Sequence, residues 1–255
     1  MTVLHCDRLG DGPPLLLLHA TLSSSRQLRT LAARLAMRFS VISVDRRGSG
    51  LSTFGAPADS IDVAVHVADL ANILEAGHVL PAAIVGHSYG GCVALELAAR
   101  RPELVSAVFA YEPPYGPVAP AEAQAGMAEV ARQTLEARDR DDLEGAALAF
   151  MAGVSGADAV AALRPAARAR IGRAGQGAVA DATLLGMDPD GLERISSPVR
   201  IATGGASAPL YAAIAEALAA RIPGADHERL EGMDHMAPVL RPEVVAVAVE
   251  AFLDR

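Results

Sequence analysis

Ser88 lies at the centre of the segment 86–90, Gly-His-Ser-Tyr-Gly, between a buried apolar run and a helical pattern rich in small residues. This Gly-x-Ser-x-Gly pattern is the sequence form of a nucleophile elbow, a sharp strand-to-helix turn that exposes a serine hydroxyl. Gly86 and Gly90 supply the small neighbours that such a turn requires. Glycines here could also serve only tight strand-to-helix packing. The flanking strand and helix favour Ser88 as a nucleophile.

A serine hydroxyl is a weak nucleophile and needs an aligned base. His235 lies in a loop between the last expected strand and the last expected helix, and it follows Ser88 in chain order. From there its imidazole would reach back over the sheet edge as general base. We expect His87 to point away from the nucleophile and pack, and His19 to brace its own loop. The remaining histidines are expected to be structural or surface residues: His5, His66, His78 and His227.

An acyl-transfer site also needs backbone N–H groups that stabilise a developing oxyanion. One is expected from Tyr89, directly after the nucleophile at the helix N-terminus. The other is expected from the loop at 19–22 that follows the first buried strand, with the N–H of Thr21 as the donor. Thr21 and Tyr89 therefore form the predicted oxyanion hole.

Alternating strands and helices would position these residues. Short apolar runs predict strands, and helical spacing of apolar residues follows most of them. The predicted strands are 13–18, 40–45, a run ending at 85, 105–111, 198–204 and 227–230. The predicted helices are 26–38, 61–76, a helix after 88, 211–221 and 242–253. This alternation indicates an α/β fold with a mostly parallel central sheet and helices on both faces.

The segment 115–195 interrupts the alternation with helical stretches rich in Ala, Arg and Gly and without a convincing strand. We therefore expect one α/β core at 1–114 and 196–255, with a helical cap inserted at 115–195. Apolar residues of this insertion and of the His235 loop could line a substrate pocket, although each could equally be ordinary packing. These candidates are Tyr115, Met127, Phe150, Met187 and Met236.

The amino-acid composition argues against several classes of function. All 22 basic residues are Arg, so no Lys is present to form a Schiff base or to serve a phosphate loop. A net charge of −8 with few aromatics and no Trp argues against a nucleic-acid partner. No metal-binding spacing or nucleotide loop appears, so we expect no cofactor, and a small molecule is the expected partner. Nothing in the sequence indicates an oligomeric state.

Location and redox state follow from two further observations. No apolar run reaches membrane-spanning length and no secretory signal is evident, so we expect a cytoplasmic protein without membrane contact. Two cysteines in a chain of this length do not form a disulfide framework. Cys6 and Cys92 are therefore expected to be reduced core residues.

Four ordered segments together resemble the α/β-hydrolase fold family over nearly the whole chain. They are the His-Ala turn at 19–20, Asp-Arg-Arg-Gly-Ser-Gly-Leu-Ser at 45–52, Gly-His-Ser-Tyr-Gly-Gly at 86–91 and Gly-Met-Asp-His at 232–235. The resemblance implies a serine, acid and histidine triad. Ser88 stands where haloalkane dehalogenases and epoxide hydrolases carry Asp, which argues against their alkyl-enzyme chemistry. Ala20 replaces a usual glycine and narrows the backbone freedom of the loop that carries Thr21.

The triad acid departs from the pattern of the family. Most members carry it in the loop after the strand that follows the cap, and that loop here, 204–209, contains no carboxylate. Glu112, at the end of the strand before the insertion, is the best remaining acid. Haloalkane dehalogenases and a zearalenone-type lactone hydrolase group resemble it in taking a glutamate from this position. Alternatively Glu112 only ends its strand, and Asp234, Asp188 or Asp190 serves.

The leading hypothesis is a serine hydrolase that cleaves a carboxylic ester, lactone or thioester of a small, largely apolar substrate through an acyl-enzyme. A second hypothesis keeps the same triad for carbon–carbon bond hydrolysis or for cofactor-free oxygen chemistry. A third is a ligand-binding protein of the same fold that performs no catalysis.

Overall fold

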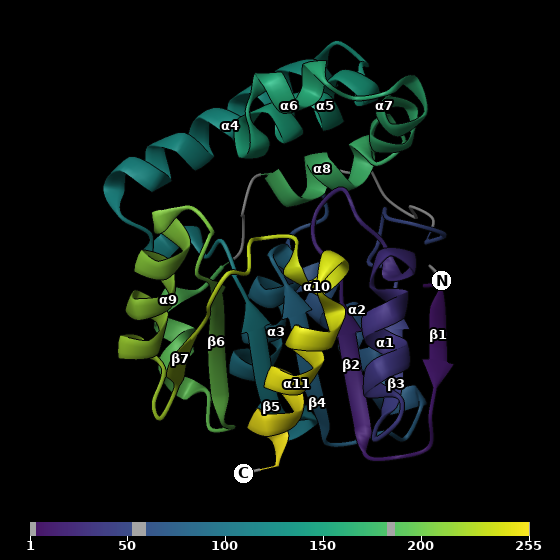
Figure 1. Ribbon diagram of the computed structural model, residues 1–255, viewed down its shortest axis with the longest axis vertical. Helices are drawn as coiled ribbons and strands as arrows, with labels where there is room; N and C mark the ends of the chain where they lie inside the picture. The colour runs from purple at the N-terminus through teal and green to yellow at the C-terminus, as the bar shows by residue number, and fades with distance from the viewer. Residues whose placement is uncertain (1–3, 53–59, 183–186, 255) are drawn as a thin grey trace.

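A computed structural model describes residues 4–52, 60–182 and 187–254. Its seven-stranded sheet has the order β1-β3-β2-β4-β5-β6-β7, in which β1 pairs antiparallel and the other neighbours pair in parallel (Figure 1). The strands are β1 (Cys6–Leu9), β2 (Pro14–Leu18), β3 (Ser40–Val44), β4 (Ala82–His87), β5 (Val105–Tyr111), β6 (Val199–Gly204) and β7 (Asp226–Leu230). The predicted α/β class with a mostly parallel sheet is confirmed.

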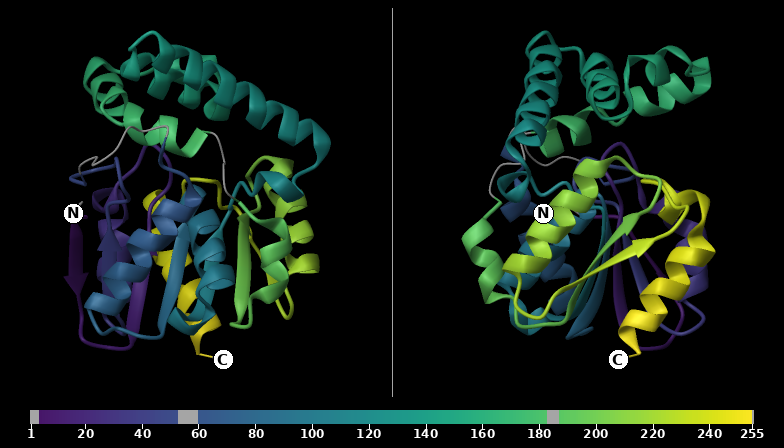
Figure 2. Two further views of the ribbon diagram at one scale, coloured as in Figure 1. Left: turned by 180° about the vertical axis from the view of Figure 1, so that it is seen from behind. Right: turned by 60° about the vertical axis from the view of Figure 1, so that its left-hand side comes forward.

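Helices cover both faces of the sheet (Figure 2). Alternate side chains of a strand point to opposite faces, so Leu16 and Leu18 of β2 enter one core cluster, whereas Leu15 and Leu17 enter another. The first cluster is completed by α2 (Val63–Ala76), α3 (Tyr89–Arg100) and α9 (Pro209–Arg221). The second is completed by η1 (Ser25–Leu28), α1 (Arg29–Leu35), α10 (Ala237–Leu240) and α11 (Pro242–Leu253). Burial on both faces explains why β2 is a continuous apolar run.

The edge strand β1 is missing from the sequence-based expectation. Its four residues, Cys-Asp-Arg-Leu, are all exposed, so they carry no apolar signal. Cys6 lies in this strand and is exposed, so the prediction that it is a core residue is wrong. Cys92 is buried as predicted, on α3. An edge strand exposes its side chains because only one neighbour and little of either helical layer covers it.

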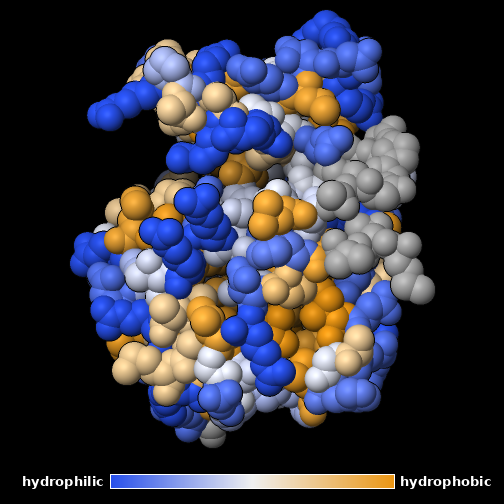
Figure 3. All heavy atoms as spheres, turned by 90° about the vertical axis from the view of Figure 1, so that its right-hand side faces the viewer, coloured by the Kyte–Doolittle hydropathy of each residue, from blue (hydrophilic) through white to orange (hydrophobic). Residues whose placement is uncertain are grey.

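A helical layer lies over the carboxyl ends of the strands (Figures 1 and 2). It consists of α4 (Ala121–Asp139), α5 (Leu143–Ser155), α6 (Ala157–Ala161), α7 (Pro165–Gly172) and α8 (Gly175–Ala182). On the face shown in Figure 3 the outer end of this layer is mostly hydrophilic, and the surface is hollowed between the layer and the sheet domain. We refer to α4–α8 as the cap. The parts of the chain that the structure describes contain no helix long and apolar enough to cross a membrane.

Both ends of the inserted segment pack on the core instead of on the cap. Tyr115, before η4 (Gly116–Val118), and Leu192, in η5 (Pro189–Arg194), belong to the core cluster of α3. A short 3₁₀ helix, η3 (Pro102–Leu104), joins α3 to β5. Glu96 on α3 is fully buried and accepts a hydrogen bond from the Tyr115 hydroxyl. It also accepts the backbone N–H of Asp188 at 2.8 Å. One carboxylate therefore fixes the start and the end of the insertion.

Candidate active site

Ser88 occupies the turn between β4 and α3 with φ 54° and ψ −124°, a strained conformation for a residue with a side chain. Its N–H donates to the Tyr111 carbonyl at 2.8 Å. A Cβ at Gly86 would lie 2.4 Å from the Gly90 carbonyl oxygen, and one at Gly90 would lie 2.7 Å from that of His19. Both positions therefore require glycine, and the segment has the geometry of a nucleophile elbow.

Glu112 and His235 are in direct contact. His235 Nδ1 lies 2.7 Å from Glu112 Oε2, and Glu112 Oε1 accepts the N–H of Gly204 at 2.7 Å. Glu112 is fully buried at the end of β5. The loop after β6, which lacks an acid of its own, thus contributes a backbone amide that orients Glu112. This contact favours the tautomer with the proton on Nδ1, which leaves Nε2 free to act as a base.

The other three carboxylates that the sequence offers as triad acids have other partners. Asp234 Oδ1 accepts the N–H of Met236 at 2.9 Å and caps the following turn. Asp188 pairs with Arg194 at 3.0 Å. Asp190 pairs with Arg221 at 2.6 Å. Of the four candidates, Glu112 is the carboxylate that contacts His235.

Three aromatic side chains hold the His235 loop. The ring of Tyr211, on α9, stacks on the His235 imidazole with centroids 4.7 Å apart and an interplanar angle of 16°. His87 Nε2 lies 2.8 Å from the His235 carbonyl oxygen, to which it donates as Nε2–H. The Tyr111 hydroxyl donates to the Asp234 carbonyl at 2.7 Å. His87 therefore packs against the His235 loop, in line with the packing role expected of it, and it also lines the cavity described below. Sequence reasoning missed Tyr211, because a single tyrosine in a helix carries no chemical signal.

The loop after β2 is braced by His19. The imidazole is fully buried, its Nε2 accepts the N–H of Arg46 at 3.0 Å, and its Nδ1 lies 2.7 Å from the Ala20 carbonyl. Burial, reinforced by the charge of Arg46, lowers the pKa of His19 to about 3. The side chain is therefore a neutral structural brace, as expected. It orients the backbone that leads to Thr21.

A buried ion pair between Arg46 and Asp181 joins the segment after β3 to the cap. Arg46 donates to both oxygens of Asp181 at 2.8 Å and 2.7 Å, and both side chains are 1% exposed. The Thr21 hydroxyl donates to Asp181 Oδ2 at 2.7 Å. Arg46 also lies over the ring of Tyr89, 4.9 Å from its centroid. Asp181, on α8 of the cap, thus contacts Thr21 directly and Tyr89 through Arg46. These two residues carry the predicted oxyanion donors.

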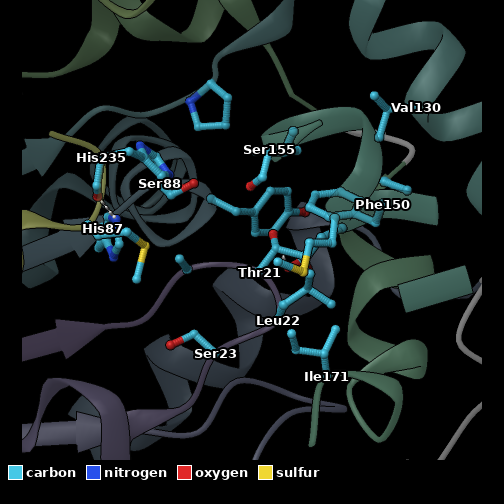
Figure 4. A pocket seen from close by; sticks show the side chains of 18 of the residues that line it. Thr21, Leu22, Ser23, His87, Ser88, Val130, Phe150, Ser155, Ile171 and His235 are labelled. Atoms are coloured by element: carbon cyan, nitrogen blue, oxygen red, sulfur yellow. Dashed lines mark hydrogen bonds between the residues drawn. The ribbon is translucent and has the colours of Figure 1, made fainter. Parts of the chain in front are cut away.

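A cavity of about 290 Å³ lies between the cap and these residues. Ser88 and His235 lie at one end in Figure 4, with Val130 and Phe150 toward the other. Among the predicted pocket residues, Met127, Phe150 and Met236 line it. Tyr115 does not, because its fully buried side chain is bound to Glu96, and Met187 packs on the core cluster of α3 instead. Within the described ranges, no three His, Cys, Asp or Glu side chains are grouped to hold a metal.

Comparison with known proteins agrees with this geometry. Residues 13–150 match the sequence model of the alpha/beta hydrolase fold family. The chain belongs to the α/β-hydrolase fold family. Members of this family carry the nucleophile at the turn after a central strand, which is the position of Ser88 between β4 and α3.

Individual relatives cover the chain along most of its length. It is 31% identical over 264 aligned residues to a 2-(acetamidomethylene)succinate hydrolase of Mesorhizobium japonicum, covering 96% of this α/β hydrolase and 89% of the relative. A solved α/β hydrolase from Sphaerobacter thermophilus is 27% identical with a TM-score of 0.74, covering 99% and 100% of the two chains. An enol-lactonase from Burkholderia xenovorans is 20% identical with a TM-score of 0.78, covering 100% and 97%, and shows the shared fold alone.

Proposed function

We propose that this α/β hydrolase is a serine hydrolase for carboxylic esters, lactones or thioesters of largely apolar acids. The observation that carries the proposal is the buried Glu112 carboxylate 2.7 Å from His235 Nδ1, at the same sheet edge as a serine in the elbow conformation. A carboxylate in this position stabilises a histidine that takes up a proton during nucleophilic attack. The apolar lining of the cavity supports an apolar acyl or alcohol group.

The chemistry follows from the roles of these groups. Ser88 Oγ attacks the carbonyl carbon while His235 Nε2 takes the hydroxyl proton, and Glu112 stabilises the imidazolium. The backbone N–H groups of Tyr89 and Thr21 stabilise the oxyanion of the tetrahedral intermediate. His235 then returns the proton to the leaving oxygen or sulfur. Water, deprotonated by the same imidazole, hydrolyses the acyl-enzyme and restores Ser88.

Ser88→Ala tests the proposal directly. The wild-type protein is expected to hydrolyse p-nitrophenyl acetate and to be labelled at Ser88 by a fluorophosphonate. The variant should remain folded by circular dichroism and lose about 10³-fold or more in kcat, because the nucleophile is absent. Ser106→Ala is the matched control, since Ser106 is exposed on β5. Equal turnover by Ser88→Ala, or failure of the probe to label Ser88, would exclude the mechanism.

Carbon–carbon bond hydrolysis is a second candidate for the same triad. The relative named for 2-(acetamidomethylene)succinate keeps this candidate open, because that name designates neither an ester nor a lactone and so indicates that a related chain performs another hydrolysis. Assays with β-diketones beside esters, with mass analysis of products formed in ¹⁸O-labelled water, separate the two reactions. Turnover of diketones with no turnover of esters would favour carbon–carbon cleavage.

A further inference from the structure

A second cavity, of about 600 Å³, lies beside the first between the cap helix α4 and the core helix α9. Five residues line both cavities: Pro114, Met127, Val130, Val154 and Tyr211. Tyr211 is the ring that stacks on His235. Tyr211 therefore lies both on the wall of the second cavity and against the imidazole.

The walls of the second cavity are almost entirely apolar. Proline, alanine, glycine, methionine, valine, leucine and tyrosine make up all of its lining except Glu122. Glu122 is exposed in the first turn of α4, so its charge is directed to water. Walls of this kind can bury an aliphatic group but offer it few hydrogen bonds. They therefore select ligands by the length of the aliphatic group and not by the positions of polar groups.

We infer that the second cavity holds the distal part of an unbranched acyl chain whose carbonyl carbon is attacked by Ser88. The inference rests on the proposed function and narrows its substrates to esters or thioesters of medium-chain acids. Met127 lies on the wall of both cavities. Its unbranched, flexible side chain can move aside to let a chain pass, which a branched or aromatic residue would do less readily.

Gly126, on α4, provides a way to fill the second cavity. It lines that cavity, and a Cβ built on it would meet no heavy atom within 4 Å. Gly153 lines the same cavity but is unsuitable, because its Cβ would lie 2.3 Å from Val130 Cγ2. Leucine at position 126 would occupy the space left by the missing side chain. It would also favour the helix, since glycine is a poor helix former.

The test compares kcat/KM for p-nitrophenyl esters from acetate to decanoate in the wild type and in Gly126→Leu. In the wild type kcat/KM should rise by about fourfold for each methylene that enters the second cavity. In Gly126→Leu the ratio of decanoate to acetate kcat/KM should fall at least tenfold, with an equal or higher unfolding temperature. Ala128→Leu adds the same side chain at an exposed position of α4 outside both cavities and should retain the wild-type profile.

The outcomes separate this inference from the proposed function. Hydrolysis of short esters with a flat chain-length profile, or equal profiles for Gly126→Leu and Ala128→Leu, would overturn the second cavity as an acyl site. Absence of hydrolysis at every chain length would overturn the proposed function instead. In that case calorimetric binding of p-nitrophenyl decanoate to Ser88→Ala still tests the cavity. Binding weakened by adding Gly126→Leu, but not by adding Ala128→Leu, would support it, and equal binding by all three proteins would overturn it.

Discussion

Two carboxylates at the candidate site are almost completely buried but have different partners. Glu112 is 0% exposed and is bound by His235 Nδ1 and by the Gly204 N–H. Asp181 is 1% exposed and is bound by both terminal nitrogens of Arg46 and by the Thr21 hydroxyl. Glu112 therefore has a partner, the His235 imidazole, that can gain and lose a proton. The partner of Asp181 is the Arg46 guanidinium, which is always charged.

This difference assigns the two carboxylates different tasks. Burial alone would raise the pKa of Asp181, but the Arg46 guanidinium and hydrogen bonds from His66 and Arg46 outweigh it and hold that pKa well below its usual range. The negative charge of Asp181 is therefore compensated at all times, as suits a structural tie between cap and core. Glu112 gains a cationic partner when His235 takes a proton. Its electrostatic contribution is thus greatest during the reaction.

Glu112→Gln should produce the largest effect on catalysis. Glutamine keeps the size of the side chain and an oxygen for the Gly204 N–H, but it removes the charge and favours the wrong His235 tautomer. We expect kcat for p-nitrophenyl acetate to fall by about 10³- to 10⁴-fold, by analogy with the known cost of a mis-tautomered triad. The free energy of unfolding, measured by urea titration, should change far less in proportion than kcat. A near-normal kcat would transfer the role of acid to another carboxylate.

The two carboxylates also differ in how far the sequence reveals them. Glu112 follows a strongly apolar strand, and the loop at 204–209 has no acid, so elimination within a known fold points to it. Asp181 lies in a helix of eight residues, and its partner Arg46 is 135 positions away. No local pattern connects two such residues. Contacts that depend on how a cap docks are fixed by tertiary packing, which periodicity does not encode.

The same reasoning separates the well-predicted elements from the missed ones. The prediction of a strand at 105–111 has the bounds that the structure gives to β5, because burial on both faces leaves an apolar run that only Ser106 interrupts. The exposed strand β1 left no such run. Met127 and Tyr115 look alike as apolar residues of the insertion, yet the first lines the cavity and the second is bound to Glu96 in the core. Their environments differ because Tyr115 lies where the insertion leaves the core and Met127 lies on the cap. That position is set by the fold and not by the residue type.

Asp181→Asn should affect stability more than chemistry. It leaves the Arg46 guanidinium buried without a counter-charge, which typically costs about 3–5 kcal/mol. We expect that loss in the free energy of unfolding, measured by urea titration, with a fall in kcat of about tenfold because the amide oxygen can still accept the Thr21 hydroxyl. Asp181→Asn should therefore lower mainly the free energy of unfolding, whereas Glu112→Gln should lower mainly kcat.

Asp69→Asn is the matched control for the loss of an Arg–Asp pair. Asp69 pairs with Arg47, and both side chains are 13% exposed. Because water reaches this pair, its loss should cost about 1 kcal/mol, with kcat retained. Equal destabilisation by Asp69→Asn and Asp181→Asn, or a larger loss of kcat in Asp181→Asn than in Glu112→Gln, would abolish the distinction between a structural and a catalytic carboxylate.

The dependence of stability on pH separates Asp181 from the buried histidines. Burial lowers the pKa of His19 to about 3 and also lowers the pKa values of His66 and His87. In the unfolded chain each takes up a proton near pH 6.5. Below that pH the unfolded state binds more protons, so the free energy of unfolding falls as pH drops from about 6.5 toward the folded pKa values. Each histidine still neutral in the folded protein at pH 5 costs about 2 kcal/mol there.

Asp181 acts in a lower window of pH. Its folded pKa lies below its unfolded value, so the stability that it contributes is present above about pH 4 and is lost only as pH falls further. Urea titrations at pH 8, 7, 6 and 5 should therefore show Asp181→Asn less stable by a similar amount throughout. His87→Gln should instead reduce the slope between pH 6 and pH 5 by about one proton, because the unfolded chain has one fewer imidazole to protonate. A wild-type stability that does not change from pH 7 to pH 5 would mean that these imidazoles are protonated in the folded protein, which would contradict the lowered pKa values of His19, His66 and His87.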